Sequence, residues 1–141
     1  MKIARRSLIV GMMVLIPFGS GAQTEYPVHV SIIQLIATPE RFDGKIVAVT
    51  GFLTIGRESD FLYLSQTDYE HALPENALTF DLTEGMGKDR EQLNGRYVRL
   101  VGVFRASRPG GYPCPNGKIT NVSRYHVWSF SNGPVDDTLD H

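Results

Sequence analysis

The chain has 141 residues, with 14 basic and 15 acidic side chains, four histidines and one cysteine. This length is enough for one hydrophobic core of ordinary size but not for two. The net charge of −1 argues against a protein that grips nucleic acid through a basic surface, and a lone cysteine excludes an internal disulfide.

The first 22 residues have the three parts of an export signal. Basic residues come first, an apolar run follows from Leu8 to Phe18, and the small residues Ser20 and Ala22 stand where a signal peptidase cuts. The apolar run has about a dozen residues, fewer than the ~20 that a membrane-spanning helix needs. We therefore predict a signal peptide at 1–22, removal of that segment after Ala22, and a periplasmic or secreted product without a membrane span.

Removal of residues 1–22 changes the charge of the chain. It takes away three of the 14 basic residues, Lys2, Arg5 and Arg6, and none of the 15 acidic ones. The remaining 11 basic and 15 acidic residues give a formal net charge of about −4, since histidine is neutral at pH 7. This balance further disfavours nucleic acid as a partner.

The segment after the signal predicts a helix and a short helical turn. Ser31 suits the N-cap of a helix with an apolar side, and this helix ends before Pro39. Thr38 and Pro39 then suit the start of a second turn that delivers Phe42 to the core.

The most informative pattern occurs twice. Residues 42–53, FDGKIVAVTGFL, match residues 93–104, LNGRYVRLVGVF, position for position. In each copy an apolar residue, Asp or Asn, Gly and a cation precede a strand that has a glycine at its sixth residue. The Asp-Gly and Asn-Gly pairs predict turns, because these residue types tolerate positive φ.

Both repeated strands predict one apolar face that a glycine interrupts. The residues on these faces are Val47, Val49, Leu53 and Ile55 in the first strand and Val98, Leu100, Phe104 and Ala106 in the second. Gly51 and Gly102 stand at the same point in the two faces. They predict that each strand bends sharply or is approached closely by another backbone, as in a small closed barrel.

The rest of the chain predicts three more strands and two helical segments. Strands are expected at 61–64 and 77–82, with Leu62, Leu64, Leu78, Phe80 and Leu82 facing inward, and at 118–128, where the apolar phase slips and predicts a bulge. A helical turn is expected at 67–73, ended by Pro74, and a short helix at 83–93. The acidic residues 131–141 are expected to be a disordered tail.

This element order resembles the OB-fold, a five-stranded Greek-key barrel with a helix between its third and fourth strands. The resemblance covers about residues 44–129, and with the helix in front it implies a mainly β barrel domain at 23–130. The segments at 31–36, SIIQLI, and 42–45, FDGK, are also similar to a group of small exported bacterial proteins of unassigned function. That second resemblance brings no catalytic residues with it.

Signals for chemistry are weak. Asp68, Glu70 and His71 form the densest ionisable cluster, and Asp68 and His71 are spaced to share a face of a helical turn and could contribute to a metal site. No second ligand pair follows, so a solvated polar turn is the preferred interpretation. Cys114 lies between two prolines, and a tolerated free thiol is preferred over pairing between chains or metal ligation. We predict no catalytic residue, no metal and no cofactor.

The OB-fold resemblance implies a binding surface. In that fold, ligands lie across strands two and three, between two loops. On this chain the surface would present Phe61, Tyr63, Thr79 and Asp81, with Arg57 and Glu58 on one side and Arg105, Arg108 and Tyr112 on the other. The alternative is that the front helix or the turn around Asp68 covers the two aromatic rings.

These observations predict an exported, non-enzymatic binding module. Its partner would be an envelope protein, a peptide or a glycan, contacted through the 105–117 loop and the face of strands two and three. One alternative is an oligonucleotide-binding OB-fold protein that uses Arg105, Arg108, Arg124 and Tyr125. Another is a metal-dependent hydrolase built on the Asp68, Glu70 and His71 turn.

Overall fold

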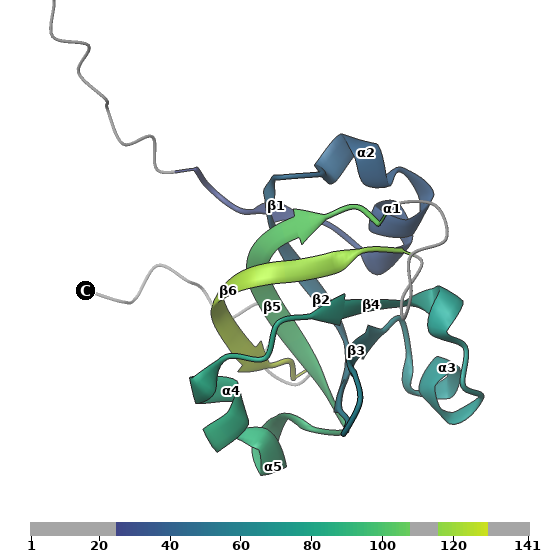
Figure 1. The fold of residues 1–141 in the computed structure, drawn as a ribbon, viewed down its shortest axis with the longest axis vertical. Helices are drawn as coiled ribbons and strands as arrows, with labels where there is room; N and C mark the ends of the chain where they lie inside the picture. Colours follow the sequence, from purple (N-terminus) through teal and green to yellow (C-terminus); the bar gives the residue numbers. More distant parts are fainter. Residues whose placement is uncertain (1–24, 108–115, 130–141) are drawn as a thin grey trace, which may run out of the picture.

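A computed structural model describes residues 25–107 and 116–129 of the chain, and these form a mainly β structure (Figure 1). The strands are β1 (Val28–His29), β2 (Ile46–Ile55), β3 (Asp60–Tyr63), β4 (Ala77–Phe80), β5 (Arg96–Arg105) and β6 (Lys118–Val127). The helices are α1 (Ile32–Ala37), α2 (Pro39–Phe42), α3 (Gln66–Glu70), α4 (Glu84–Lys88) and α5 (Arg90–Leu93), and a 3-10 turn, η1, occupies Pro74–Asn76.

Five strands close into a barrel. Their order is β2-β3-β4-β6-β5, and β5 pairs back onto β2. Neighbouring barrel strands are antiparallel except β4 and β6, which run parallel. Strand β1 adds a short parallel pairing on the edge of β2 opposite β5. Helices α4 and α5 connect the third barrel strand, β4, to the fourth, β5. The predicted OB-like barrel is therefore confirmed.

The core follows from the alternation of the long strands. Val47, Val49 and Leu53 of β2 face Leu100 and Phe104 of β5, and all five side chains are fully buried. Complete burial of such a side chain contributes roughly 1.5–3 kcal/mol to folding. Helices α1 and α2 lie at one end of the barrel and α4 and α5 at the other, where Leu35 of α1 and Met86 of α4 are fully buried in the same core cluster (Figure 1).

The repeated segments are related by an approximate two-fold axis that maps each residue onto the one 51 positions later. Asp43 Oδ1 accepts a hydrogen bond from the N–H of Ala106 at 2.9 Å, and the equivalent Asn94 Oδ1 accepts one from the N–H of Ile55 at 2.8 Å. Val49 pairs with Leu100, its own equivalent, so the axis passes through this pair. Each turn thus binds the far end of the other half's long strand.

The backbone of the two turns repeats the same exchange. The N–H of Gly44 donates to the carbonyl of Phe104 at 2.8 Å, and the N–H of Gly95 donates to that of Leu53 at 2.9 Å. Only the glycines have positive φ, +78° and +72°, while Asp43 has φ −57° and ψ 127°. These are type II turns, in which the third residue alone needs positive φ. The predicted turns are present. Asp43 and Asn94 are needed in them for the side-chain oxygens that accept hydrogen bonds, and not for a positive φ.

The equivalence extends into the helices before the turns. Thr38 ends α1 and begins α2, and Asp89, 51 residues later, ends α4 and begins α5. The two halves of the barrel therefore share a unit of two short helices, a turn and a long strand.

Gly51 and Gly102 are required by close packing. A Cβ atom at Gly51 would lie 2.6 Å from the carbonyl oxygen of Tyr63 and 2.6 Å from the Cδ1 atom of Ile32. One at Gly102 would lie 2.7 Å from the carbonyl oxygen of Thr120. The prediction that another backbone approaches both glycines is confirmed.

Several predicted boundaries change. Pro74 begins the η1 turn as well as following α3, and the helix predicted at 83–93 divides into α4 and α5 at Asp89. Strand β4 ends at Phe80, so Leu82 is 40% exposed and does not face inward as predicted. The predicted bulge in the last strand is present, because the β5–β6 register shifts between Val101 and Val103.

The predicted signal peptide at 1–22 and acidic tail at 131–141 lie outside the described residues. In the described part of the chain, no helix combines the length and the apolar character needed to cross a lipid bilayer.

We expect Gly51→Ala to lower the free energy of unfolding by about 1–3 kcal/mol, because the new methyl group must displace the Tyr63 backbone. The control is Gly87→Ala in α4, where a Cβ atom meets nothing within 4 Å and helix propensity favours alanine by up to about 1 kcal/mol. Urea unfolding of the two variants measures the difference. Equal stability of both variants would contradict close packing at Gly51.

Candidate functional site

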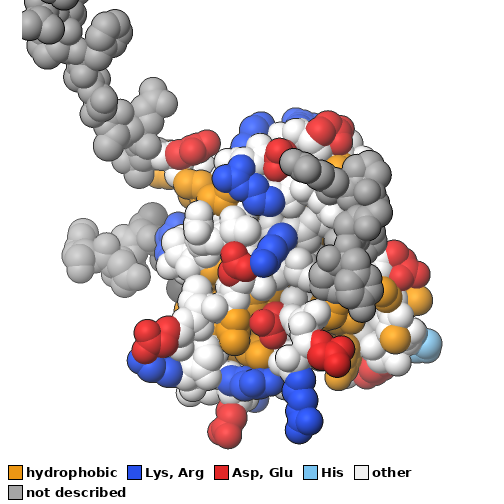
Figure 2. All heavy atoms as spheres, in the orientation of Figure 1, with side chains coloured by type: hydrophobic (Ala, Val, Ile, Leu, Met, Phe, Trp, Pro, Cys, Tyr) orange, Lys and Arg blue, Asp and Glu red, His pale blue; other side chains and the backbone are white. Residues whose placement is uncertain are grey.

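A hollow of about 520 Å³ lies where four strand ends converge. We call it the charged hollow, because five of its residues are ionisable. It is lined by Glu58, Ser59, Asp60, Thr79, Phe80, Asp81, Leu82, Arg105, Ala106, Ser107, Gly117 and Lys118. Figure 2 shows the face of the molecule that carries β4 and β6, where basic and acidic side chains are interspersed and apolar side chains show between them.

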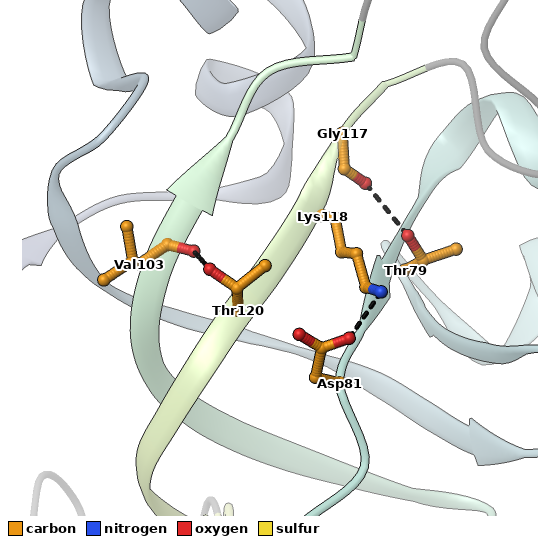
Figure 3. Close-up of polar contacts among 6 residues, drawn as sticks. All are labelled: Thr79, Asp81, Val103, Gly117, Lys118 and Thr120. Atoms are coloured by element: carbon orange, nitrogen blue, oxygen red, sulfur yellow. Dashed lines mark hydrogen bonds and ion pairs between the residues drawn. The ribbon is translucent and has the colours of Figure 1, made fainter.

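Contacts between β4 and the start of β6 shape one wall of the charged hollow (Figure 3). Lys118 forms an ion pair with Asp81, and the hydroxyl of Thr79 donates to the carbonyl of Gly117 at 3.4 Å. On the other side of β6, Thr120 donates its hydroxyl to the carbonyl of Val103 at 3.2 Å. The wall is fixed on both sides by hydrogen bonds.

The β2–β3 loop, residues 56–59, forms another wall. Arg90 of α5 donates to the carbonyl oxygens of Ile55, at 2.8 Å, and Gly56, at 3.4 Å. Asn94 accepts from the N–H of Ile55, as described above. Helix α5 and its turn therefore set where the loop begins.

Asp60 carries an electrostatic cost inside the charged hollow. Burial raises the pKa of its carboxyl above the usual value of 3.8, although the N–H of Gly56 and the charges of Arg90 and Lys118 act in the opposite direction. At neutral pH, the ionised carboxylate is thus less well solvated than in water. A cationic group of a bound ligand would relieve this cost.

A second hollow, of about 550 Å³, adjoins the first and shares Glu58 and Ser59 with it. We call it the aromatic hollow. Its other lining residues are Gly56, Arg57, Phe61, Tyr63, Ala72 and Pro74. The rings of Phe61 and Tyr63 lie 5.5 Å apart, centroid to centroid, on the outer side of β3.

Helix α3 covers part of this outer face. The ring of Tyr69 lies 5.6 Å from the rings of both Phe52 and Tyr63, so Tyr63 is only 7% exposed. The hydroxyl of Tyr97 accepts from the N–H of Gln66 at 3.2 Å and holds the start of the helix. Tyr63 presents little of its ring to the aromatic hollow, whereas Phe61 is only partly buried.

The candidate residues divide between the two hollows. Arg105 lines the charged hollow, and Arg57, Phe61 and Tyr63 line the aromatic hollow. Arg108 and Tyr112 lie outside the described residues. Sequence reasoning missed Asp60 and Lys118 as lining residues, because their position in the hollow depends on which strand ends meet. The signal that could have found them is a charged residue at the first position of a strand.

The cluster at Asp68 has a structural role. Its carboxylate accepts hydrogen bonds from the hydroxyl of Ser65, at 2.5 Å, and from the amide of Asn76, at 2.8 Å, and these bonds lower the pKa of the carboxyl. His71 Nδ1 lies 2.9 Å from the carbonyl oxygen of Thr67. No three His, Cys, Asp or Glu side chains among the described residues are placed to hold a metal ion together, and Cys114 is not one of those residues.

The arginines proposed for oligonucleotide binding do not form one patch. Arg105 lines the charged hollow, while Arg124 lies beside Val101 of β5 and lines a different, smaller hollow. Tyr125 packs against the core and donates its hydroxyl to Asp89 at 2.9 Å. Arg108 falls outside the described ranges.

Comparison with known sequences finds no family model that matches the chain and no similar curated protein. Seventeen solved chains match its fold. One is a protein named as an aspartyl-tRNA synthetase from Leishmania major Friedlin, 10% identical, with a TM-score of 0.44. The match covers 79% of this chain and 22% of that one.

We expect Asp60→Asn to raise the free energy of unfolding at pH 7. Because the folded-state pKa of Asp60 is raised, the protonated carboxyl favours the folded state. This stabilisation is fully present below pH 3.8 and is lost as pH rises through the folded-state pKa, so at pH 7 the carboxylate disfavours the fold. The gain should therefore vanish near pH 3. Denaturant unfolding at both pH values measures it, and a gain that persists unchanged at pH 3 would contradict the burial of this charge.

The matched control is Asp68→Asn, for which the sign is reversed. Its folded-state pKa is lowered, so the carboxylate stabilises the fold above pH 3.8 and loses this effect as pH falls through the folded value. The control variant should be less stable than the parent at pH 7 and should approach it in acid.

Proposed function

We propose that this chain is an exported, non-enzymatic binding module that holds an extended peptide segment of an envelope protein. The observation that carries the proposal is the junction of the charged and aromatic hollows at Glu58 and Ser59. An extended peptide places alternate side chains on one surface, and two adjoining hollows of different character suit such a ligand. The ligand would enter beside Arg105 and extend toward Phe61.

The charges favour a peptide over a phosphate backbone. Glu58, Asp60 and Asp81 place three carboxylates in the charged hollow, against two cations, Arg105 and Lys118. Carboxylates repel phosphates, whereas a peptide can offer both an acidic and a basic side chain. Asp60, whose charge is partly buried, would accept a lysine or arginine of the ligand, and Arg105, which forms no ion pair among the described residues, would accept a carboxylate.

The experiment is selection of a displayed random-peptide library on the purified protein, followed by affinity measurement of the enriched peptides. We expect enriched sequences to combine a basic residue, an acidic residue and an apolar residue, and Arg105→Glu to weaken their binding at least tenfold. Arg96→Glu is the matched control, because it makes the same charge change at the exposed opposite end of β5.

Three outcomes would overturn the proposed function. Selection on the parent protein could enrich no sequence more strongly than selection on the Arg105→Glu variant does. The two arginine variants could lose affinity equally, which would mean only that net charge matters. A glycan or a single-stranded oligonucleotide could bind at the same hollows more tightly than any selected peptide, and the ligand class would then be wrong.

Export is the part of the proposal that rests on residues 1–22. We expect the protein isolated from the source cell envelope to begin at Gln23, and we expect replacement of Ala22 by a bulky charged residue to leave the precursor uncut. Intact-mass measurement of the two proteins checks this. A full-length mass for the parent protein in the cytoplasmic fraction would contradict it.

A further inference from the structure

A small hollow on another side of the barrel is lined by two arginines and two histidines. It has a volume of about 40 Å³ and lies against β1, β2, β5 and β6, whereas the charged hollow lies at the ends of β3, β4, β5 and β6 and shares no lining residue with it. Ala48 and Val101 form its buried floor. Its walls are Pro27, His29, Arg99, Arg124 and His126. We call it the cationic hollow.

Strand register brings these side chains together from four strands. Ala48 lies between His29 of β1 and Val101 of β5, and Val101 lies opposite Arg124 of β6. Two residues before Val101 on β5, Arg99 lies opposite His126 of β6. Two arginines and two histidines therefore surround two small or medium apolar side chains on the outer face of the barrel.

Arg99 is held in place. Its Nε donates to the hydroxyl of Thr50 at 3.2 Å, and its guanidinium carbon lies 4.2 Å from the centre of the Trp128 ring. The backbone N–H of Trp128 donates to the carbonyl of Tyr97 at 2.7 Å, which fixes the backbone that carries this indole. A guanidinium that is fixed through Nε and through one face still has its two terminal nitrogens for another acceptor. Because the side chain is already ordered, binding that acceptor costs little further conformational entropy.

The arginines of the cationic hollow have no acidic partner among the described residues. None of its lining residues is acidic, and neither Arg99 nor Arg124 forms an ion pair with any described residue. Two guanidinium groups close together repel each other, and imidazole N–H groups add further donors whether or not the rings are charged. Such an arrangement becomes favourable when an anion lies between the donors.

The volume limits what that anion can be. One water needs roughly 10–15 Å³ of such space, so 40 Å³ has room for about three waters or one small oxyanion. Planar guanidinium groups match the oxygen spacing of phosphate and sulfate.

We propose that the cationic hollow binds a single tetrahedral oxyanion of the phosphate or sulfate class, through Arg99, Arg124, His29 and His126. The anion can be free in solution or can be the terminal group of a phosphate ester. This site is independent of the proposed peptide site, since the two share no lining residue.

The experiment is a titration of the purified protein with inorganic phosphate at pH 7, with ionic strength kept constant by potassium chloride. Trp128 is the only tryptophan of the chain, so its fluorescence reports on the contact with Arg99. Amide chemical shifts of residues 48, 99, 101, 124 and 126 report on the hollow itself. We expect saturable changes in both signals.

Two variants test the arginines. Arg124→Gln, at an exposed position, should weaken phosphate binding at least tenfold, and Arg99→Lys should weaken it comparably although the charge is kept, because lysine lacks the planar fork. Arg96→Gln is the control, since it removes the same charge from an exposed position of β5 that does not line the hollow. It should leave the affinity unchanged.

The outcomes are distinct. Phosphate binding that exceeds chloride binding and requires Arg124 supports the site. Glycerol 3-phosphate that binds at least tenfold more tightly than phosphate identifies an ester as the source, and equal affinity identifies the free anion. Changes that chloride reproduces at the same ionic strength, or that Arg124→Gln leaves intact, would overturn the proposal, whatever the result of the peptide selection.

Discussion

The pairing of β2 with β5 is the constraint on which the other elements depend. It runs from Ile46 opposite Val103 to Leu53 opposite Arg96, and an approximate two-fold axis passes through its centre. Side-chain acceptors from the Asp-Gly and Asn-Gly turns bind the far ends of the opposite strands. Each long strand is therefore completed by groups from the other half, and the helices of each half close the barrel above and below this pair.

The candidate sites lie where the two halves differ. Ala48 on β2 corresponds to Arg99 on β5, and Thr54 corresponds to Arg105, so at these two positions only the second half carries a charge. Arg99 lines the cationic hollow and Arg105 the charged hollow. Several positions that are apolar in both halves, such as Val47 and Val98, are fully buried in both. The shared residues thus form the scaffold, and the unshared ones form the surfaces offered to ligands.

The barrel could be predicted because its determinants are local in sequence. Alternating strands, paired turns and the equal phase of Gly51 and Gly102 are visible without knowing which segments meet. The hollows could not be predicted fully, because Asp60 and Lys118 approach each other only after β3, β4 and β6 are in place. The cover on Tyr63 likewise depends on where α3 lies, and the sequence left both arrangements of that ring open.

The reciprocal bonds of the two turns also bear on how the chain reaches its native state. Asn94 binds a strand end 39 residues earlier, and Asp43 binds one 63 residues later. Neither contact can form until most of the barrel sequence has been synthesised, and topologies dominated by such distant contacts fold in milliseconds to seconds, more slowly than helical bundles. Until the second half is synthesised, β2 lacks β5, the strand with which it makes its longest pairing, so the β2 edge that β5 covers remains open to other interactions.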